Sequence, residues 1–409
     1  MRVVYLNPSG QLGGAEMALL DLMASIRAAR PEWTLQLIAG ADGPLISRAE
    51  SLGASALALP FPPALARLGD AGLSGPDGTQ PARADLVKKL FRAGSPVFKY
   101  TAELKRALRA MQPDVIHTNG FKMHVLGPWA RPRKSMPVIW HVRDYVGARP
   151  LMARLLRWHA AQCSAVVTNS VSVAADVRAV CGEDLKIYPV HDAIDLERFS
   201  PNGKKLDLDA LAGLHEAAEG TLRVGLLATL AHWKGHKTFL RALSLLPPQL
   251  KVRGYIIGGA LYQTDGSQHS LDELRCEAAR LNLADKIGFT DFVEDAASAM
   301  RALEIVVHAS TQPEPFGLVI AEAMACGRAL VASEAGGAAE IINAGTDALG
   351  HKPGDARGLA ERLMQLAADK DLRERLGHNG RLTAERRFDR ARLAKELIPV
   401  YDEAVLAEN

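Results

Sequence analysis

Short apolar runs rich in β-branched residues alternate along the chain with longer segments in which apolar residues recur every three or four positions. The short runs predict strands, and the longer segments predict amphipathic helices. In the first half, strands are predicted at 3–7, 35–40, 115–118, 138–142 and 165–169, and helices at 15–29, 45–52, 152–162 and after Ser172. Strands that alternate with helices typically form a parallel, doubly wound sheet, which binds ligands at the carboxyl ends of its strands.

A polar, loop-rich stretch from about 187 to 220 separates this alternation from a second one. There the pattern predicts strands at 224–227, 252–257, 287–289, 305–307 and 329–332, and helices at 238–246, 271–281, 356–367 and 390–406. We therefore predict two α/β domains, residues 1–190 and 191–389. The segment 60–96 breaks the pattern with many Pro, Gly and Ala residues and predicts a long loop.

The composition is that of a soluble globular protein, because 48% of the 409 residues are hydrophobic and no apolar run approaches the ~20 residues that cross a bilayer. The opening residues are too few and too strand-like for a signal peptide. The cysteines lie in apolar helical segments without metal-ligand spacing, which predicts reduced core residues and a cytoplasmic location. They are Cys163, Cys181, Cys276 and Cys326.

The net charge of +3 hides a strongly basic region between Arg83 and Arg157, which holds 16 basic and 4 acidic residues. A basic face attracts phosphates on lipids, sugar-nucleotides or nucleic acid. The stretch 88–109 mixes Lys and Arg with Leu, Val and Phe, so it could lie on an anionic membrane surface. An ordinary amphipathic helix with a solvated cationic face explains it equally well. Aromatic and basic residues do not interleave as in single-strand binding, so no nucleic-acid partner is expected.

The segment from Glu314 to Glu322 is the most informative part of the sequence. An apolar strand precedes it, and an apolar run of good helix formers ends it, so Pro315 and Gly317 mark a strand-to-helix turn. One carboxylate stands at the turn, and the other lies roughly 12 Å further along the helix. The backbone N–H groups at the helix start suit an anionic group such as a diphosphate.

This segment resembles the Glu-x7-Glu signature of the retaining glycosyltransferases of family 4, enzymes with the GT-B fold. The flanking Pro315-Phe316-Gly317 and the later Ser333-Glu-Ala-Gly336-Gly337-Ala-Ala-Glu340 make a chance match improbable. The resemblance extends along nearly the whole chain. It implies an α/β protein with two facing Rossmann-like domains, an interdomain cleft, and a C-terminal helix, 390–409, that packs back on the first domain.

The resemblance also implies how a nucleotide-sugar donor is bound. Glu314 would contact the transferred sugar, Glu322 would take the ribose hydroxyls, and Lys234 would contact the diphosphate. The full set of donor-binding residues that it implies is Gly13, Gly14, Lys234, Gly258, Gly259, Val293, Phe316, Gly317, Leu318 and Glu322. From the residues alone, each Gly-Gly pair after a strand could equally be a tight connection, and Gly336-Gly337 with Glu340 could be a structural cap.

His141 ends a predicted strand of the first domain, where a structural role would be the ordinary explanation of a lone histidine. Family 4 enzymes have a histidine here, near the transferred sugar, so His141 and Glu314 are the predicted catalytic residues. The predicted acceptor-binding residues are Asn119, Lys122, Arg143 and Asp144, and the loop 60–96 would be a flap near the acceptor. Arg143 and Asp144 could instead form a simple ion pair.

The chain departs from the family pattern at two places. Thr229 stands where many relatives have an Arg that neutralises the leaving diphosphate, and Asp192-Ala193 replaces the usual Asn-Gly. Leaving-group stabilisation would then depend on Lys234, helix N-termini, or a cation such as His232 or Arg143. The single Asp-x-Asp, at 207–209, has no third oxygen ligand nearby in sequence and is better explained by helix capping, so neither metal nor cofactor is expected.

The predicted function is transfer of a sugar from a UDP- or GDP-sugar to a saccharide or lipid-linked acceptor, with retention, in cell-surface glycan or glycolipid synthesis. The predicted location is the cytoplasm, with peripheral attachment to the inner face of the cytoplasmic membrane as an option. The alternatives are a non-catalytic carbohydrate- or membrane-binding protein on a GT-B scaffold and a GT-B sugar-nucleotide epimerase. A nicotinamide oxidoreductase is disfavoured because no Gly-x-Gly-x-x-Gly turn is present.

Overall fold

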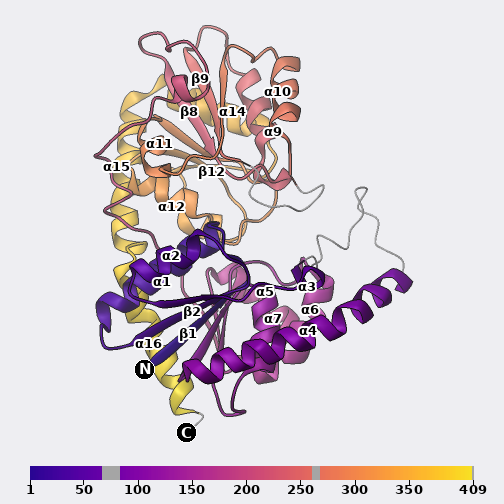
Figure 1. The fold of residues 1–409 in the computed structure, drawn as a ribbon. Coiled ribbons are helices and arrows are strands. Elements are labelled where there is room, and N and C mark those ends of the chain that lie inside the picture. Colours follow the sequence, from indigo (N-terminus) through magenta and orange to yellow (C-terminus); the bar gives the residue numbers. More distant parts are fainter. Residues whose placement is uncertain (67–82, 260–267, 408–409) are drawn as a thin grey trace. The chain divides into compact units, whose positions relative to one another are not determined.

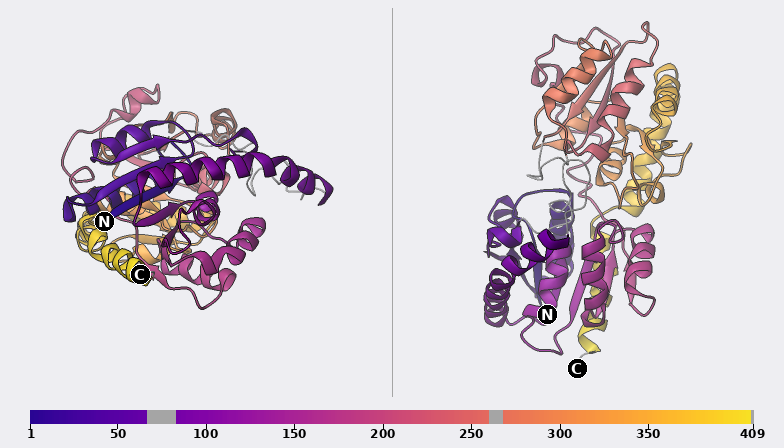
Figure 2. Two further views of the ribbon diagram at one scale, coloured as in Figure 1. Left: turned by 60° about the horizontal axis from the view of Figure 1, so that its bottom comes forward. Right: turned by 90° about the vertical axis from the view of Figure 1, so that its right-hand side faces the viewer.

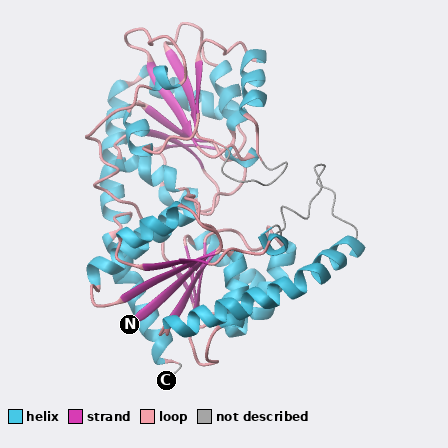
Figure 3. Ribbon diagram, viewed as in Figure 1, coloured by secondary structure: helices cyan, strands magenta, loops and turns pink. Residues whose placement is uncertain are grey.

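The computed structural model describes residues 1–66, 83–259 and 268–407. The chain divides into two compact units, coloured by sequence in Figure 1. Unit 1 comprises Met1–Ala193 together with Arg390–Asn409, and unit 2 comprises Ile194–Asp389. Each unit contains one parallel sheet with helices around it (Figure 3), so the predicted pair of Rossmann-like α/β folds is confirmed.

Unit 1 is built on a seven-stranded parallel sheet of order β3-β2-β1-β4-β5-β6-β7. The strands are β1 Arg2–Asn7, β2 Thr34–Ala39, β3 Ser55–Ala58, β4 Val115–Asn119, β5 Val138–Val142, β6 Ala165–Thr168 and β7 Ile187–Pro189. Its helices are α1 Gly14–Ala29, α2 Pro44–Ser51, α3 Pro63–Ala66, α4 Arg83–Met111, α5 Phe121–Ala130, α6 Pro150–His159, α7 Val171–Cys181 and α16 Ala391–Leu406. Helices α1 and α16 pack on one face of the sheet and α4 to α7 on the other (Figure 2).

Unit 2 is built on a six-stranded parallel sheet of order β10-β9-β8-β11-β12-β13. The strands are β8 Leu222–Leu227, β9 Val252–Ile257, β10 Ile287–Thr290, β11 Ile305–His308, β12 Ala329–Ser333 and β13 Leu349–His351. Its helices are α8 Leu208–Leu211, α9 His236–Ser244, α10 Leu271–Arg280, α11 Ala296–Arg301, α12 Leu318–Ala325, α13 Ala338–Ile341, α14 Ala356–Ala368 and α15 Lys370–Arg387. Strands β11 and β12 are buried over their full lengths, which explains why they are apolar except for the last residue of each, His308 and Ser333.

Each sheet has one place where the strand order reverses. In unit 1 the chain runs outward from β1 in one direction and from β4 in the other, and in unit 2 it does so from β8 and β11. The loops after these neighbouring strands leave toward opposite faces of the sheet, so the carboxyl ends at the reversal are the usual ligand site of a doubly wound fold. Gly13 follows β1, Asn119 ends β4, and Lys234 and Glu314 follow β8 and β11; the other candidate residues lie at or beyond the ends of these and neighbouring strands.

The predicted loop at 60–96 is wrong over its second part, because α4 begins at Arg83 and includes Pro96. Further along α4, Tyr100, Leu104 and Leu108 are completely or almost completely buried in the core of unit 1. This tertiary packing outweighs the local cost of Gly94 and Pro96 in a helix. The middle of the predicted loop, 67–82, lies outside the described residues.

Helix α15 had no counterpart among the predicted elements. Its buried stripe includes small residues, Gly377 and Gly380, so the hydrophobic periodicity is weak. These glycines have a packing role: a Cβ on Gly377 would lie 2.4 Å from the carbonyl oxygen of Gly327. The absence of a side chain thus lets α15 approach the end of α12 closely.

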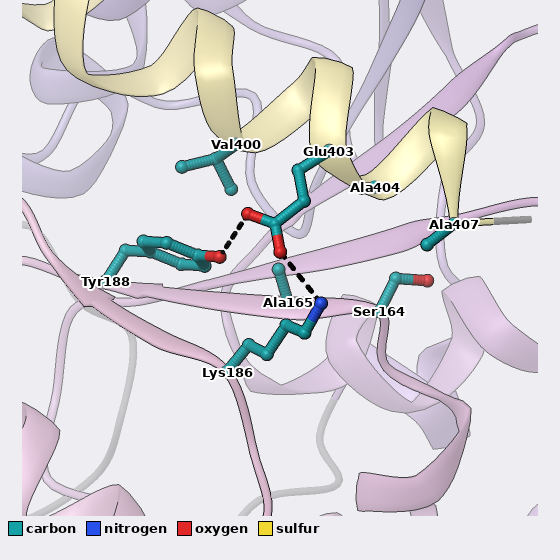
Figure 4. Close-up of a pocket in the computed structure, with 8 residues that line it drawn as sticks. All are labelled: Ser164, Ala165, Lys186, Tyr188, Val400, Glu403, Ala404 and Ala407. Carbon is teal, nitrogen blue, oxygen red and sulfur yellow. Dashed lines mark hydrogen bonds and ion pairs between the residues drawn. The ribbon is translucent and has the colours of Figure 1, made fainter.

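The C-terminal helix α16 belongs to unit 1. Its apolar face, which includes Leu397, Val400 and Tyr401, is buried in the same core as α1. Near its end, Glu403 accepts hydrogen bonds of 2.7 Å from both Lys186 Nζ and Tyr188 Oη at the rim of a small surface pocket (Figure 4). Because Lys186 and Glu403 are about half exposed, this ion pair stabilises little, and apolar burial holds the helix in place.

We therefore predict that Leu397→Ala lowers the free energy of unfolding of unit 1 by about 2–5 kcal/mol, because Leu397 is completely buried. Leu406→Ala, in the same helix but 74% exposed, should change it by less than about 0.5 kcal/mol. Guanidinium titrations followed by tryptophan fluorescence would measure both. Equal losses in the two variants would contradict the packing of α16 on unit 1.

Candidate active site

In unit 2, the ends of the adjacent strands β8 and β11 bring Lys234 and Glu314 together. Lys234 Nζ donates to both carboxylate oxygens of Glu314, at 3.0 Å to Oε1 and 2.9 Å to Oε2. The side chains are only 19% and 8% exposed. Two predicted donor-site residues, 80 positions apart in sequence, therefore form one buried ion pair at the strand-order reversal.

The position of Lys234 depends on close contact between two loop backbones. Gly235 has a left-handed φ of 78°, and a Cβ there would lie 1.8 Å from the carbonyl oxygen of Ala309. Beside it, Thr311 N donates to the carbonyl oxygen of Trp233 at 2.8 Å. The loop after β8 is thus docked on the loop after β11, and only glycine permits that approach.

The Glu314 turn is held by the loop that follows β12. Glu314 N donates to the carbonyl oxygen of Ala335 at 3.2 Å, and Gly337 N donates to that of Glu314 at 2.7 Å. This short parallel bridge joins the Gly336-Gly337 turn to the Glu-x7-Glu segment. Gly317 then takes a left-handed φ of 100° to begin α12.

The Glu314 carboxylate has two further neighbours, which the sequence analysis left without a role. Ser310 Oγ donates to Oε2 at 2.8 Å, and His308 Nε2 lies 3.1 Å from the same oxygen. Burial disfavours the charged carboxylate, but Lys234 and the hydrogen bond to His308 outweigh it and hold the pKa of Glu314 well below its usual range. His308 is the one polar residue of the apolar strand β11, and that was the available signal.

The other predicted donor residues of unit 2 follow the carboxyl ends of β9, β10 and β11. Gly258 has a φ of 144°, and a Cβ would lie 2.1 Å from the carbonyl oxygen of Ala228, so it packs against the loop after β8. Phe316 is buried against Phe388. The remaining residues, Gly259, Val293, Leu318 and Glu322, are partly buried.

In unit 1, His141 lies at the end of β5 and Asn119 directly opposite it at the end of β4. Alternation along the strands places His117, Asn119, His141 and Arg143 on one face, the face that α1 and α16 cover. His141 is 2% exposed, and its Nδ1 lies 3.1 Å from His117 Nε2. Burial and the neighbouring Arg143 lower the pKa of His141 far below 6.5, so the imidazole is neutral.

Arg143 and Asp144 do not pair with each other. Arg143 forms a buried ion pair with Asp192 and donates from Nε to Asn119 Oδ1 at 3.0 Å. Asp144 pairs with Arg149 at 2.6 Å on the surface. Asp192, one of the departures from the family pattern, thus neutralises the buried guanidinium, and the suggested Arg143–Asp144 ion pair is wrong.

The remaining predicted residues of unit 1 lie around the ends of β1 and β4. Gly13 is the N-cap of α1, and its N–H donates to Glu16 Oε2 at 3.1 Å; Gly14, the next residue, is exposed. Asn119 donates from Nδ2 to Asn7 Oδ1 at 2.7 Å, so this buried amide is fully engaged within the unit. Lys122 donates to the carbonyl oxygen of Ala66 at 2.6 Å.

The Asp-x-Asp pair has a structural role. Asp207 caps α8 by accepting from Ala210 N at 3.0 Å. Asp209 is buried and accepts from Arg253 at 2.5 Å, from Tyr255 Oη at 2.6 Å and from Arg223 at 3.0 Å, which ties α8 to β8 and β9. In the part of the chain that the structure describes, no group of three or more His, Cys, Asp or Glu side chains could hold a metal ion.

Two family models match this sequence. The model described as Glycosyltransferase Family 4 matches residues 13–198, and that described as Glycosyl transferases group 1 matches residues 215–383. Between them they take in most of both units. The chain belongs to glycosyltransferase family 4.

Named relatives and solved structures agree with this family assignment. The family 4 chain is 32% identical over 248 residues to D-inositol 3-phosphate glycosyltransferase of Streptomyces bingchenggensis, a match that covers 59% of this chain and only 53% of that protein. It is 27% identical over 301 residues to the lipopolysaccharide core biosynthesis mannosyltransferase LpcC of Rhizobium leguminosarum bv. viciae, covering 70% and 83%. HepE of Anabaena, solved with UDP and glucose, superimposes with a TM-score of 0.78 at 25% identity over 98% and 99% of the two chains. The GT-B fold is thereby confirmed.

Because Gly235 touches the Ala309 backbone, we predict that Gly235→Ala lowers the free energy of unfolding of unit 2 by more than about 3 kcal/mol. The control is Gly213→Ala, which has a similar φ of 66° but no atom within 4 Å, and which should cost only about 1–2 kcal/mol. Thermal unfolding of both variants would compare them. Similar shifts would mean that the docked loops are not what positions Lys234.

Proposed function

We propose that this protein is a retaining glycosyltransferase that moves a sugar from a nucleotide-sugar to an acceptor hydroxyl in the synthesis of a cell-surface glycan or glycolipid. The observation that carries the proposal is the buried pair of Lys234 and Glu314 at the strand-order reversal of unit 2. A cation and a carboxylate at one place can meet the two chemically different parts of a nucleotide-sugar, the diphosphate and the sugar hydroxyls.

In the proposed reaction, the bond between the anomeric carbon and the diphosphate oxygen breaks as the acceptor oxygen bonds to the same face of that carbon. The acceptor proton passes to the departing diphosphate oxygen, so no protein base has to take it. Charge develops on the diphosphate as it leaves, and Lys234 with the backbone N–H groups at the start of α12 would stabilise it. Glu314, kept ionised by its neighbours, would accept hydrogen bonds from the sugar hydroxyls.

We assign the remaining donor contacts from family 4. Glu322 would take the ribose hydroxyls, the Val293 backbone would meet the base, and the glycines at 13–14 and 258–259 would let backbone approach the donor. His141 would act beside the transferred sugar. Asn119 and Arg143 are hydrogen-bonded to other side chains of unit 1 and would hold this part of the unit in place. Lys122 and Asp144 remain the proposed acceptor contacts.

The donor and acceptor are proposed from the relatives. HepE was solved with UDP and glucose, and LpcC is described as a lipopolysaccharide core mannosyltransferase. UDP-glucose and GDP-mannose are therefore the first donors to test, with saccharides and lipid-linked saccharides as acceptors. An α-linked product is expected from α-linked donors.

We predict that Glu314→Gln lowers kcat for sugar transfer at least about 100-fold, because a neutral amide replaces a preorganised charge. Binding of the free nucleoside diphosphate should change less than about threefold. Lys234→Met should instead weaken nucleoside diphosphate binding by about tenfold or more, since it removes a charge-assisted contact. Calorimetry would give the Kd values and product analysis the rates.

Glu361→Gln, on the exposed surface of α14, is the matched control and should leave transfer unchanged. Lys234→Met leaves a buried carboxylate without its partner, which destabilises the fold. The double variant Lys234→Met/Glu314→Gln removes that carboxylate charge as well. Weak nucleotide binding by both variants would therefore not be a consequence of unfolding. Near-normal turnover by Glu314→Gln would remove Glu314 from the active site. Donor binding by the unmodified protein without transfer to any acceptor would favour the non-catalytic alternative.

We also propose that unit 1 associates with an anionic membrane surface. Leu104 and Leu108 of α4 are buried, so that part of α4 cannot contact lipid through its apolar stripe. The better candidate is the patch around Trp158, which is 73% exposed, and Trp129, which is 39% exposed; both contact the ring of His159. The exposed basic residues near these tryptophans in sequence are Arg133, Lys134, Arg154 and Arg157. Exposed tryptophan beside basic side chains suits an anionic interface.

In the described part of the chain, no helix combines the length and apolar character of a membrane span. We predict that the protein floats with vesicles containing phosphatidylglycerol and not with phosphatidylcholine alone, and that Trp158→Ala weakens this binding at least about threefold. Leu245→Ala, an exposed apolar site of unit 2, is the control and should have no effect. Flotation that is independent of lipid charge would reject the proposal.

A further inference from the structure

A chain of hydrogen-bonded side chains runs through unit 1 from the C-terminal helix to His141. Tyr401 Oη of α16 lies 2.8 Å from His117 Nδ1, and His117 Nε2 lies 3.1 Å from His141 Nδ1. Tyr401 and His117 are completely buried, and His141 is 2% exposed. Strands β4 and β5 place the two histidines diagonally on one face, within reach of each other.

Arg143 determines where the protons of this chain lie. Its Nη2 is 3.2 Å from His141 Nδ1, and a guanidinium has only donors, so His141 Nδ1 must be an acceptor without a proton. Because His117 Nε2 faces the same nitrogen, it must carry a proton and donate. A neutral imidazole has one ring proton, so His117 Nδ1 accepts, and Tyr401 Oη donates to it.

The surroundings of His117 and His141 keep both imidazoles neutral. Burial, with Arg143 nearby, lowers the pKa of His117 to about 3 and that of His141 far below its usual value. The single proton of His141 therefore lies on Nε2. Among the residues that the structure describes, this buried Nε2 has no hydrogen-bond partner, whereas Nδ1 has two. A buried N–H without a partner is uncommon in folded proteins and calls for an explanation, and at the end of a strand beside the candidate site an acceptor on a ligand supplies one.

We infer that Tyr401 and His117 are positioning residues that, with Arg143, fix His141 in the Nε2–H tautomer, so that His141 donates a hydrogen bond to an oxygen of the bound sugar. The identity of that ligand rests on the proposed function; the tautomer does not. In this arrangement His141 cannot act as a general base through Nε2, because that nitrogen already holds the proton. The C-terminal helix thus contributes to the site although none of its residues was predicted there.

His124 provides a contrast within the same unit. Thr118 Oγ1 donates its one proton to the carbonyl oxygen of Ile139 at 3.1 Å, so His124 Nδ1, 2.7 Å from Thr118 Oγ1, must donate to that hydroxyl. His124 is therefore the Nδ1–H tautomer, opposite to that of His117 and His141. One protein contains both kinds, which makes an internal control.

The tautomers can be measured without turnover, from the two-bond and three-bond nitrogen–proton correlations of protein labelled with ¹⁵N-histidine. We expect His141 and His117 to show a protonated Nε2 and a bare Nδ1, and His124 to show the reverse, throughout pH 6–8. Single His→Gln variants assign the signals. A proton on His141 Nδ1, or a doubly protonated His141 at neutral pH, would overturn the inference.

Substitutions then test the positioning role. Tyr401→Phe should leave the proton of His117 on Nε2, because Arg143 still makes His141 Nδ1 an acceptor, but should shift the Nδ1 signal of His117, which loses its hydrogen bond. His117→Met should lower kcat about tenfold with little change in the donor KM, whereas His117→Gln, which is of similar size and can still donate to His141 Nδ1, should retain more of the rate. Circular dichroism checks that each variant is folded.

Equal rates for the Met and Gln variants, or an unchanged His117 signal in Tyr401→Phe, would reject the positioning role. Absence of transfer from every donor would count against the proposed function alone, because the nitrogen signals report the tautomers independently.

Discussion

The buried pair of Lys234 and Glu314 depends on two loops that touch through their backbones. Adjacent parallel strands, β8 and β11, end at the same edge of the sheet, which brings both loops there, but only the missing side chain of Gly235 lets one lie on the other. Once the loops are docked, each charge compensates the burial of the other, and removal of either partner would leave an uncompensated charge in a poorly solvated place. The docking of the loops and the pairing of the two charges therefore depend on each other.

In unit 1 burial keeps the site residue uncharged, whereas in unit 2 the buried site residue stays charged. In unit 2 a cation and hydrogen-bond donors surround Glu314 and keep the carboxylate ionised. In unit 1 nearly complete burial and, after it, a neighbouring guanidinium keep His141 neutral, and the guanidinium itself is balanced by Asp192. A neutral imidazole can donate from one fixed nitrogen, whereas an ionised carboxylate can only accept. The two units thus present complementary hydrogen-bonding groups whose protonation is set by packing and not by the solution pH.

The fold could be predicted from the sequence to a large extent because strand and helix periodicities are strong at most of the elements. The Glu314 turn could be located from its position after a strand, whereas Lys234 was identified through the resemblance to family 4. Elements whose stability comes from tertiary contacts were missed. Gly377 and Gly380 obscure the apolar stripe of α15, and Pro96 obscures α4. The partners of the site residues were also missed, because Tyr401 and Asp192 are brought in by packing across distant segments and Ser310 by the turn before Glu314, which periodicity does not report.

Because Thr229 carries no positive charge, the charge available at Lys234 decides how a leaving diphosphate would be stabilised. An ammonium has three N–H donors, and Glu314 accepts at both carboxylate oxygens, so Lys234 has capacity left for a phosphate oxygen while it stays paired. The pair has no net charge, however, and Thr229 adds none at the position where the family pattern would place an Arg. In the proposed function, a leaving diphosphate would then be stabilised less by net positive charge than by directed donors: the shared ammonium and the N–H groups at the start of α12. Such donors are effective only when they are rigidly held, and the glycine-dependent docking of the two loops supplies that rigidity.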